Sequence, residues 1–122
     1  MAKFSKRSKD ILKNADIRLQ QIFNDVIKHY DCSVICSTRN KEDQNKAHRM
    51  GFSKVKYPDS LHNHKPSLAV DVIPYPTGYK SDEEFYKLAT WVFKAAQDFG
   101  VKVVFGGHWK NFKDLPHWQL KI

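Results

Sequence analysis

The chain has 122 residues, 41% of them hydrophobic, and its 21 Lys and Arg outnumber 13 Asp and Glu to give a formal charge of +8. This length and composition exclude a disordered chain and leave room for one core, so we expect a single domain over residues 1–122. The positive charge favours an anionic polymer as partner, whether nucleic acid, a membrane surface or a bacterial cell wall.

The N-terminal half predicts helix, strand and helix. Apolar residues at helical spacing predict an N-terminal helical segment within residues 1–30, which can break near Asn14. A short apolar, β-branched run over residues 32–38 predicts a buried strand. A second helix is expected to begin at the cap residue Asn40 and to end at Gly51.

The centre of the chain predicts a loop, a strand and a long helix. Residues 52–66 are polar and contain prolines, which is typical of a loop, and residues 68–73 read as a strand. Ser81 and Glu84 match a capping box that would start a third helix ending at Gly100. The expected buried face of this helix consists of Phe85, Leu88, Ala89, Val92, Phe93, Ala96 and Phe99.

The C-terminal part predicts two strands joined through a turn. Residues 101–105 and 117–122 are the strands, and Gly106 with Gly107 is the turn. Helices and strands are mixed and the late connections are hairpin-like. This favours an α+β domain with a small, mainly antiparallel sheet packed with about three helices.

The composition of the N-terminus and of the apolar windows bears on the location of the protein, and the spacing of its two cysteines bears on their redox state. The basic residues 1–7 are not followed by the apolar stretch of a signal peptide, and no window is long and apolar enough to span a membrane. We therefore expect synthesis in the cytoplasm and no stable membrane insertion. Cys32 and Cys36 lie four residues apart, too far along a strand for a normal disulfide, and are predicted to be reduced thiols of the core.

The candidate catalytic and metal-binding residues are histidines and aspartates. Four of six histidines fall in loops or at strand ends, where polar groups converge, namely His62, His64, His108 and His117. Asp71 and Asp114 accompany them. Two imidazoles, one carboxylate ligand and one spare carboxylate are what metal-assisted hydrolysis requires. His29 and His48 lie near predicted helix ends and are interpreted as partners of helix carbonyls.

Two motifs resemble a known family. Residues 60–71, Ser-Leu-His-Asn-His-Lys-Pro-Ser-Leu-Ala-Val-Asp, resemble the first metal motif of zinc D-alanyl-D-alanine carboxypeptidases and phage L-alanyl-D-glutamate endopeptidases. Residues 114–118, Asp-Leu-Pro-His-Trp, resemble the second motif. Arg39 and Gln44 resemble the upstream Arg and Gln segment, so the resemblance spans residues 37–122. It implies a Hedgehog/DD-peptidase-like fold.

The resemblance also implies roles for individual residues. His62, Asp71 and His117 would bind Zn²⁺, and zinc lowers the pKa of bound water to about 7. Asp114 would be the general base that activates this water and then protonates the leaving amine. Arg39 would polarise the scissile carbonyl and stabilise the oxyanion.

Each of the two motifs departs from the family pattern at one position. The compact form of the first motif has its histidine seven residues before the aspartate, which selects His64, whereas a longer phage-like form selects His62. We favour His62 as the ligand and place His64 beside the substrate. Asp114 stands where many relatives carry the longer Glu.

Five residues are expected to contact substrate around the cleft: Gln44, Ser60, His64, Trp109 and Trp118. Ser60 and Gln119 are also candidates for orienting the ligands, and Trp118 fits core packing equally well. A basic cluster is either solvated surface or a site for the carboxylates of a cell-wall stem peptide. It consists of Lys102, Lys110, Lys113 and Lys121.

The leading hypothesis is a monomeric zinc endopeptidase that cleaves a stem-peptide bond of bacterial peptidoglycan, L-Ala–D-Glu, in host-cell lysis by a phage or prophage remnant. It would wait in the cytoplasm until a holin opens the membrane, and its positive charge would supply affinity for the wall. A D-Ala-D-Ala carboxypeptidase or dipeptidase, and a non-catalytic zinc-stabilised wall-binding module, stay open as alternatives. A nucleic-acid binder ranks last because no recognition motif is present.

Overall fold

The N-terminal segment forms two helices, α1 (Lys6–Leu12) and α2 (Ile17–Val26), in the computed structural model, which describes residues 2–122. The predicted break near Asn14 is confirmed. At this break the backbone N–H of Ser67 donates to the carbonyl of Asn14 at 2.9 Å, and the N–H of Asp16 donates to the carbonyl of Ser67 at 2.8 Å. These two hydrogen bonds hold the loop that contains Ser67 against the segment between the two helices.

Four strands form one sheet in the order β1-β2-β4-β3, and all three pairings are antiparallel. The strands are β1 (Cys32–Cys36), β2 (Ala69–Pro74), β3 (Val103–Phe105) and β4 (His117–Leu120). The prediction of an α+β fold with a small antiparallel sheet is confirmed, with four α-helices between residues 2 and 122 where about three were expected.

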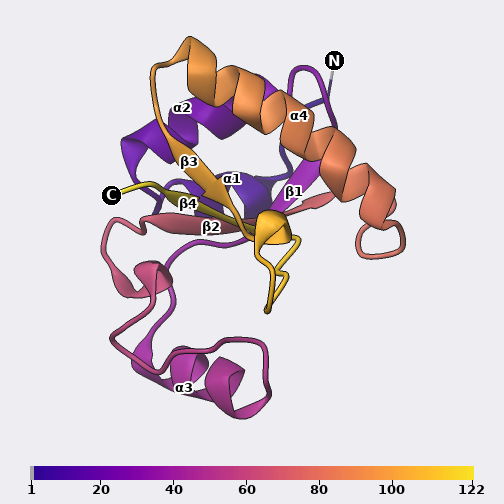
Figure 1. Cartoon of the computed structure of the whole chain (residues 1–122). Helices are drawn as coiled ribbons and strands as arrows, with labels where there is room; N and C mark the ends of the chain where they lie inside the picture. Colours follow the sequence, from indigo (N-terminus) through magenta and orange to yellow (C-terminus); the bar gives the residue numbers. More distant parts are fainter. Residues whose placement is uncertain (1) are drawn as a thin grey trace.

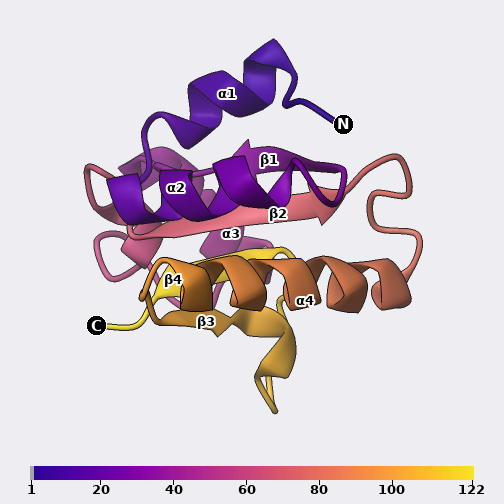
Figure 2. The ribbon, with the colours of Figure 1, turned by 90° about the horizontal axis from the view of Figure 1, so that it is seen from above.

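One face of the sheet is covered by α2 and by the long helix α4 (Asp82–Asp98), which pack against each other (Figure 1). Figure 2 shows α1 at the edge of this layer, next to β1. The core between helices and sheet includes Trp118, which is 1% exposed and stacks on Phe105 with ring centroids 4.4 Å apart. Of the two roles considered for Trp118, the structure shows core packing.

Two predictions for α4 are wrong. Ser81 precedes the helix but makes no side-chain capping bond, and the Glu84 carboxylate that would form the second bond of the box accepts from the hydroxyl of Tyr30 instead. Phe93 and Phe99, expected in the core, are 36% and 47% exposed. Phe99 is the C-cap residue of the helix.

Helix α3 (Lys41–Arg49) and the loop after it lie on the other side of the sheet, as a lobe that projects downward in Figure 1. The predicted cap is confirmed, because Asn40 accepts a 2.8 Å bond from the N–H of Asp43. The predicted loop 52–66 contains a short 3-10 helix, η1 (Leu61–Asn63), and the predicted glycine turn begins another, η2 (Gly106–His108). No helix within residues 2–122 is both long and apolar enough to cross a membrane.

Candidate functional site

Three neighbouring strands bring polar side chains into one row. Asp71 in β2 is the register partner of His117 in β4 on one side and of Cys36 in β1 on the other. Residues directly opposite on antiparallel strands project from the same face. The next residues, Val70 and Trp118, pair with each other and are buried in the core. The row of polar groups therefore lies on the face away from α2 and α4.

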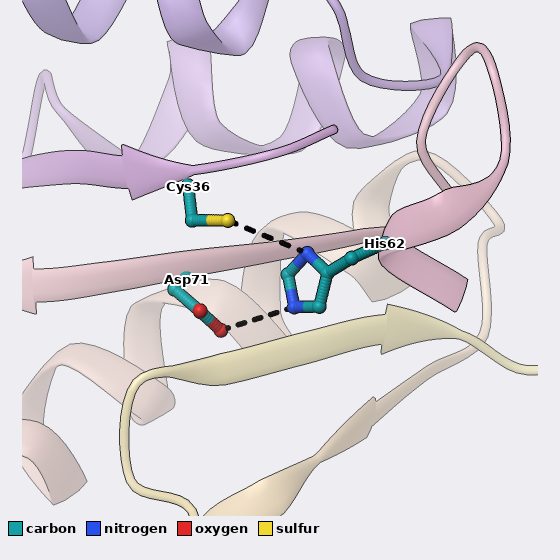
Figure 3. A group of neighbouring side chains, drawn as sticks. All are labelled: Cys36, His62 and Asp71. Atoms are coloured by element: carbon teal, nitrogen blue, oxygen red, sulfur yellow. Dashed lines mark hydrogen bonds and ion pairs between the residues drawn. The ribbon is translucent and has the colours of Figure 1, made fainter. Parts of the chain in front are cut away.

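Cys36 belongs to this row because β1 contains a bulge. Val34 pairs with Val72 while Cys36 pairs with Asp71, so two residues of β1 oppose one of β2. A bulge of this kind re-aims the side chain that follows it. The prediction that both cysteines are core thiols is correct for Cys32, which is buried, and wrong for Cys36, which is half-buried and contacts the ring of His62 (Figure 3).

His62 enters the row from η1. The hydroxyl of Ser60 accepts from the backbone N–H of His62 at 3.1 Å, and the Asn63 side chain accepts from the N–H of Ser60, which fixes the 3-10 turn. The ring Nδ1–H of His62 donates to the carbonyl of Ser37 at 2.8 Å. This bond leaves Nε2 directed at Asp71, as Figure 3 shows.

The donor atoms of this row could hold a metal ion. Asp71 Oδ1 lies 3.4 Å from His62 Nε2 and 3.5 Å from His117 Nδ1. Within residues 2–122, Asp71 Oδ1 and His62 Nε2 are buried without a hydrogen-bond partner, which is costly unless something else satisfies them. Two imidazole nitrogens and a carboxylate oxygen are ligands that zinc takes at catalytic sites. The amide oxygen Oε1 of Gln119 accepts a 2.8 Å hydrogen bond from the Nε2–H of His117 and so orients that ring.

The electrostatics of the row favour a cation beside Asp71. Burial lowers the pKa of His62, but the contacts with Asp71 and Cys36 together outweigh this effect and raise the pKa to about 10. Burial raises the pKa of Asp71, yet its contacts with His117 and His62 hold that pKa well below the usual range. A proton and a metal ion thus compete for the same position between His62 and Asp71.

Asp114 lies at the end of the row, with its Oδ2 3.9 Å from His117 Nδ1. Its N–H donates to the carbonyl of Gly106 at 3.0 Å, and a Cβ at Gly106 would lie 2.4 Å from the Asp114 carbonyl oxygen. Only glycine permits this approach. Burial, reinforced by the charge of Asp71, raises the pKa of Asp114 above its ordinary value.

Arg39 flanks the row on the other side. Its Nη2 lies 3.4 Å from Asp71 Oδ2, and its Nη1 donates to Gln44 Oε1 at 3.0 Å. Gln44 is fully buried and its amide also donates to the carbonyl of Val55 at 2.8 Å. The structure therefore places Gln44 behind Arg39, where it orients the guanidinium, and not among groups that line the cleft.

A cleft of about 1320 Å³ opens over the row, between the loop that follows α3 and the loop before β4. Of the residues expected to contact substrate, Ser60 and Trp109 line this cleft, whereas His64 is exposed outside it. The Trp109 ring lies 5.1 Å from that of His117. Sequence reasoning missed Tyr79, a cleft residue whose pKa is raised by partial removal from solvent within the cleft and by the charges of Asp71 and Asp114. Its position just after the Asp71 strand was the available signal.

Known proteins resemble this chain in sequence and in fold. The sequence profile of the phage L-alanyl-D-glutamate peptidase family matches residues 1–119. Among solved structures, the chain is similar to the crystal structure of the Serratia marcescens L-Ala D-Glu endopeptidase ChiX, with a TM-score of 0.84 and 30% sequence identity. That match covers 97% of this chain and 89% of the other. A comparison with curated protein sequences gives no match.

Proposed function

Because the chain belongs to the phage L-alanyl-D-glutamate peptidase family, we propose that it hydrolyses the L-Ala–D-Glu bond in the stem peptide of bacterial peptidoglycan. The observation that carries the proposal is the pair of buried, unpartnered atoms, His62 Nε2 and Asp71 Oδ1, at the floor of the cleft. Buried polar atoms without partners are retained where they hold a ligand or do chemistry. The family is a family of peptidases, so the chain is a hydrolase.

In this proposal His62, Asp71 and His117 hold a zinc ion, which supplies Lewis-acid activation of water and of the scissile carbonyl. The protein contributes the orientation of the three side chains. Ser37 fixes the tautomer of His62 through its carbonyl, and Gln119 fixes the ring of His117. Such outer contacts hold ligands in the geometry that binding requires.

Asp114 and Arg39 act on the reacting groups. Asp114 removes a proton from the attacking water and returns it to the leaving amine of D-Glu. Its raised pKa brings this exchange closer to neutral pH. Arg39 lines the cleft and, braced by Gln44, stabilises negative charge on the oxygen of the attacked carbonyl. A wall-binding module without turnover would need neither residue.

Further parts of the proposal concern the whole chain. Residues 1–122 act as one zinc peptidase domain and as a monomer, and the net charge of +8 holds the protein on the anionic wall. The protein reaches the wall from the cytoplasm once a holin has opened the membrane.

The test is amine release from purified peptidoglycan, with identification of the new N-terminal residue. Wild type, EDTA-treated protein with and without restored zinc, Asp114→Asn, and the exposed-site control His64→Ala are compared. A new D-Glu N-terminus, lost with EDTA and in Asp114→Asn but retained in His64→Ala, supports the proposal. Release of free D-Ala would identify a carboxypeptidase instead. Zinc binding without any release would identify a binding module.

A further inference from the structure

One wall of the cleft carries positive charge that the protein does not neutralise. Lys110 and Lys113 are exposed, both line the cleft, and neither forms an ion pair with any residue between 2 and 122. Lys54 on the opposite wall lies over the ring of Phe112, 5.4 Å from its centroid. The lysines of the 109–113 loop are thus available to a ligand that enters the cleft.

The position of this loop relative to the reacting groups is fixed by the backbone. Lys113 immediately precedes Asp114, whose N–H and carbonyl bond to Gly106 and to the N–H of His117. Consecutive Cα atoms are about 3.8 Å apart, so Lys113 is attached next to the proposed general base. Lys113 and Asp114 also line the same cleft, so a substrate held there can contact both side chains.

The substrate places an anion at that position. In peptidoglycan D-Glu continues the stem through its γ-carboxyl group, so its α-carboxylate is free. The carbon of this carboxylate is two bonds from the nitrogen of the scissile bond. It therefore approaches the carboxylate of Asp114, and like charges at such separations repel in a site of low dielectric. A cation near Asp114 removes this repulsion.

We propose that Lys113, assisted by Lys110, binds the free α-carboxylate of the D-Glu residue and selects stems that carry it over stems in which it is amidated. The proposal rests on the proposed function and adds the determinant of specificity. The earlier basic cluster is divided by the structure, since Lys102 and Lys121 do not line the cleft.

The experiment pairs a charge deletion in the protein with one in the substrate. Values of kcat/KM are measured for two soluble muramyl peptides that differ only in D-Glu or D-isoglutamine after L-Ala. The zinc-loaded proteins are wild type, Lys110→Gln, Lys113→Gln, the double variant, the opposite-wall variant Lys54→Gln, and Lys102→Gln as a matched control outside the cleft. Circular dichroism and zinc content verify that each variant is folded and loaded.

We expect wild type to prefer the D-Glu peptide by about tenfold, mainly through KM. Lys113→Gln should lose roughly fivefold on the D-Glu peptide with little change on the amidated one, and the double variant should abolish the preference. Lys102→Gln should behave as wild type.

Three results would overturn the inference while leaving the proposed function intact: equal cleavage of both peptides by wild type, equal losses on both peptides in the lysine variants, or loss of the preference in Lys54→Gln alone. Cleavage of neither peptide by wild type would instead refute the proposed function, and the inference with it.

Discussion

Asp71 and His117 are register partners across β2 and β4, and Oδ1 of the first lies 3.5 Å from Nδ1 of the second. The pairing of two strands thus sets the separation of two proposed ligands. A shift of one residue in this register would send one of the two side chains into the core. The same register places Val70 and Trp118 in the core, so packing of the core and geometry of the site depend on one alignment.

Removal of His62 should abolish zinc binding. His62→Ala takes away the buried Nε2 that faces Asp71, and we expect zinc affinity to fall by at least about 100-fold. His64→Ala, two residues away and exposed, should bind zinc as wild type does. Equilibrium dialysis with metal analysis gives both affinities. Loss of zinc from His64→Ala with retention by His62→Ala would reverse the assignment of the first ligand.

Gln119→Ala tests the support of His117. The amide of Gln119 lies 2.8 Å from Nε2 of His117, so its removal frees the ring to rotate. We expect zinc affinity to fall by about 10- to 100-fold while the fold is retained. Competition with a chromogenic chelator measures the affinity, and circular dichroism checks the fold. Unchanged affinity would show that the strand alone orients His117.

Gly106→Ala should displace Asp114. A Cβ at this position would lie 2.4 Å from the Asp114 carbonyl oxygen, and the resulting strain is expected to cost about 1–3 kcal/mol of unfolding free energy. Activity per folded molecule should fall as well, because the backbone that carries Asp114 must move.

Gly100→Ala provides the matched control. Gly100 has a φ of +69° but open space around its Cβ position, so we expect a loss of about 1 kcal/mol with unchanged activity. Urea unfolding and peptidoglycan hydrolysis separate the two effects. Equal activities of the two variants would argue against a role for the Gly106 contact.

Cys32 should make stability depend on pH in alkaline solution. Burial, with a smaller contribution from the charge of Asp31, raises the pKa of this thiol to about 12 from its ordinary value of 9.0. The folded state therefore favours the neutral thiol. Its contribution is fully present below pH 9 and is lost as the pH rises from 9 towards 12, because only the unfolded chain then ionises. Relative to Cys32→Ala, the wild type should lose about 1.4 kcal/mol per pH unit in this window.

Urea unfolding of both proteins between pH 8 and pH 11 measures this difference. If the unfolding free energies of the two proteins changed equally with pH, the pKa of Cys32 would be the same in the folded and unfolded states, and the prediction would be wrong. Alkylation at pH 8 offers a second readout, in which half-buried Cys36 reacts before Cys32.

The sequence predicted the parts of the site that local patterns encode. The order of strands and helices follows from the spacing of apolar residues, and the groups around His62, Asp71 and His117 follow from two motifs. What it did not predict depends on contacts between distant segments. The bulge that turns Cys36 outward exists only in the pairing of β1 with β2. The burial of Gln44 results from the loop after α3 folding back over it.

The same reasoning explains the incorrect capping box. Ser81 and Glu84 have the right spacing, but Tyr30, 54 residues before Glu84, competes for its carboxylate. A spacing rule describes an isolated helix, whereas here a half-buried residue outside the helix binds the Glu84 carboxylate that the rule assigns to the cap.

The N-terminal helices lie outside the two motifs of the site, yet the geometry of the site depends on their contacts. The Ser8 hydroxyl accepts from the N–H of Val34 at 3.0 Å, the Ser37 hydroxyl donates to the carbonyl of Ile11 at 2.6 Å, and Ser67 is held at the break near Asn14. Ser37 is also the residue whose carbonyl orients His62. A fragment that starts after α2 would expose these backbone groups and release the loop that bears His62, so shortened variants of this chain must retain both helices.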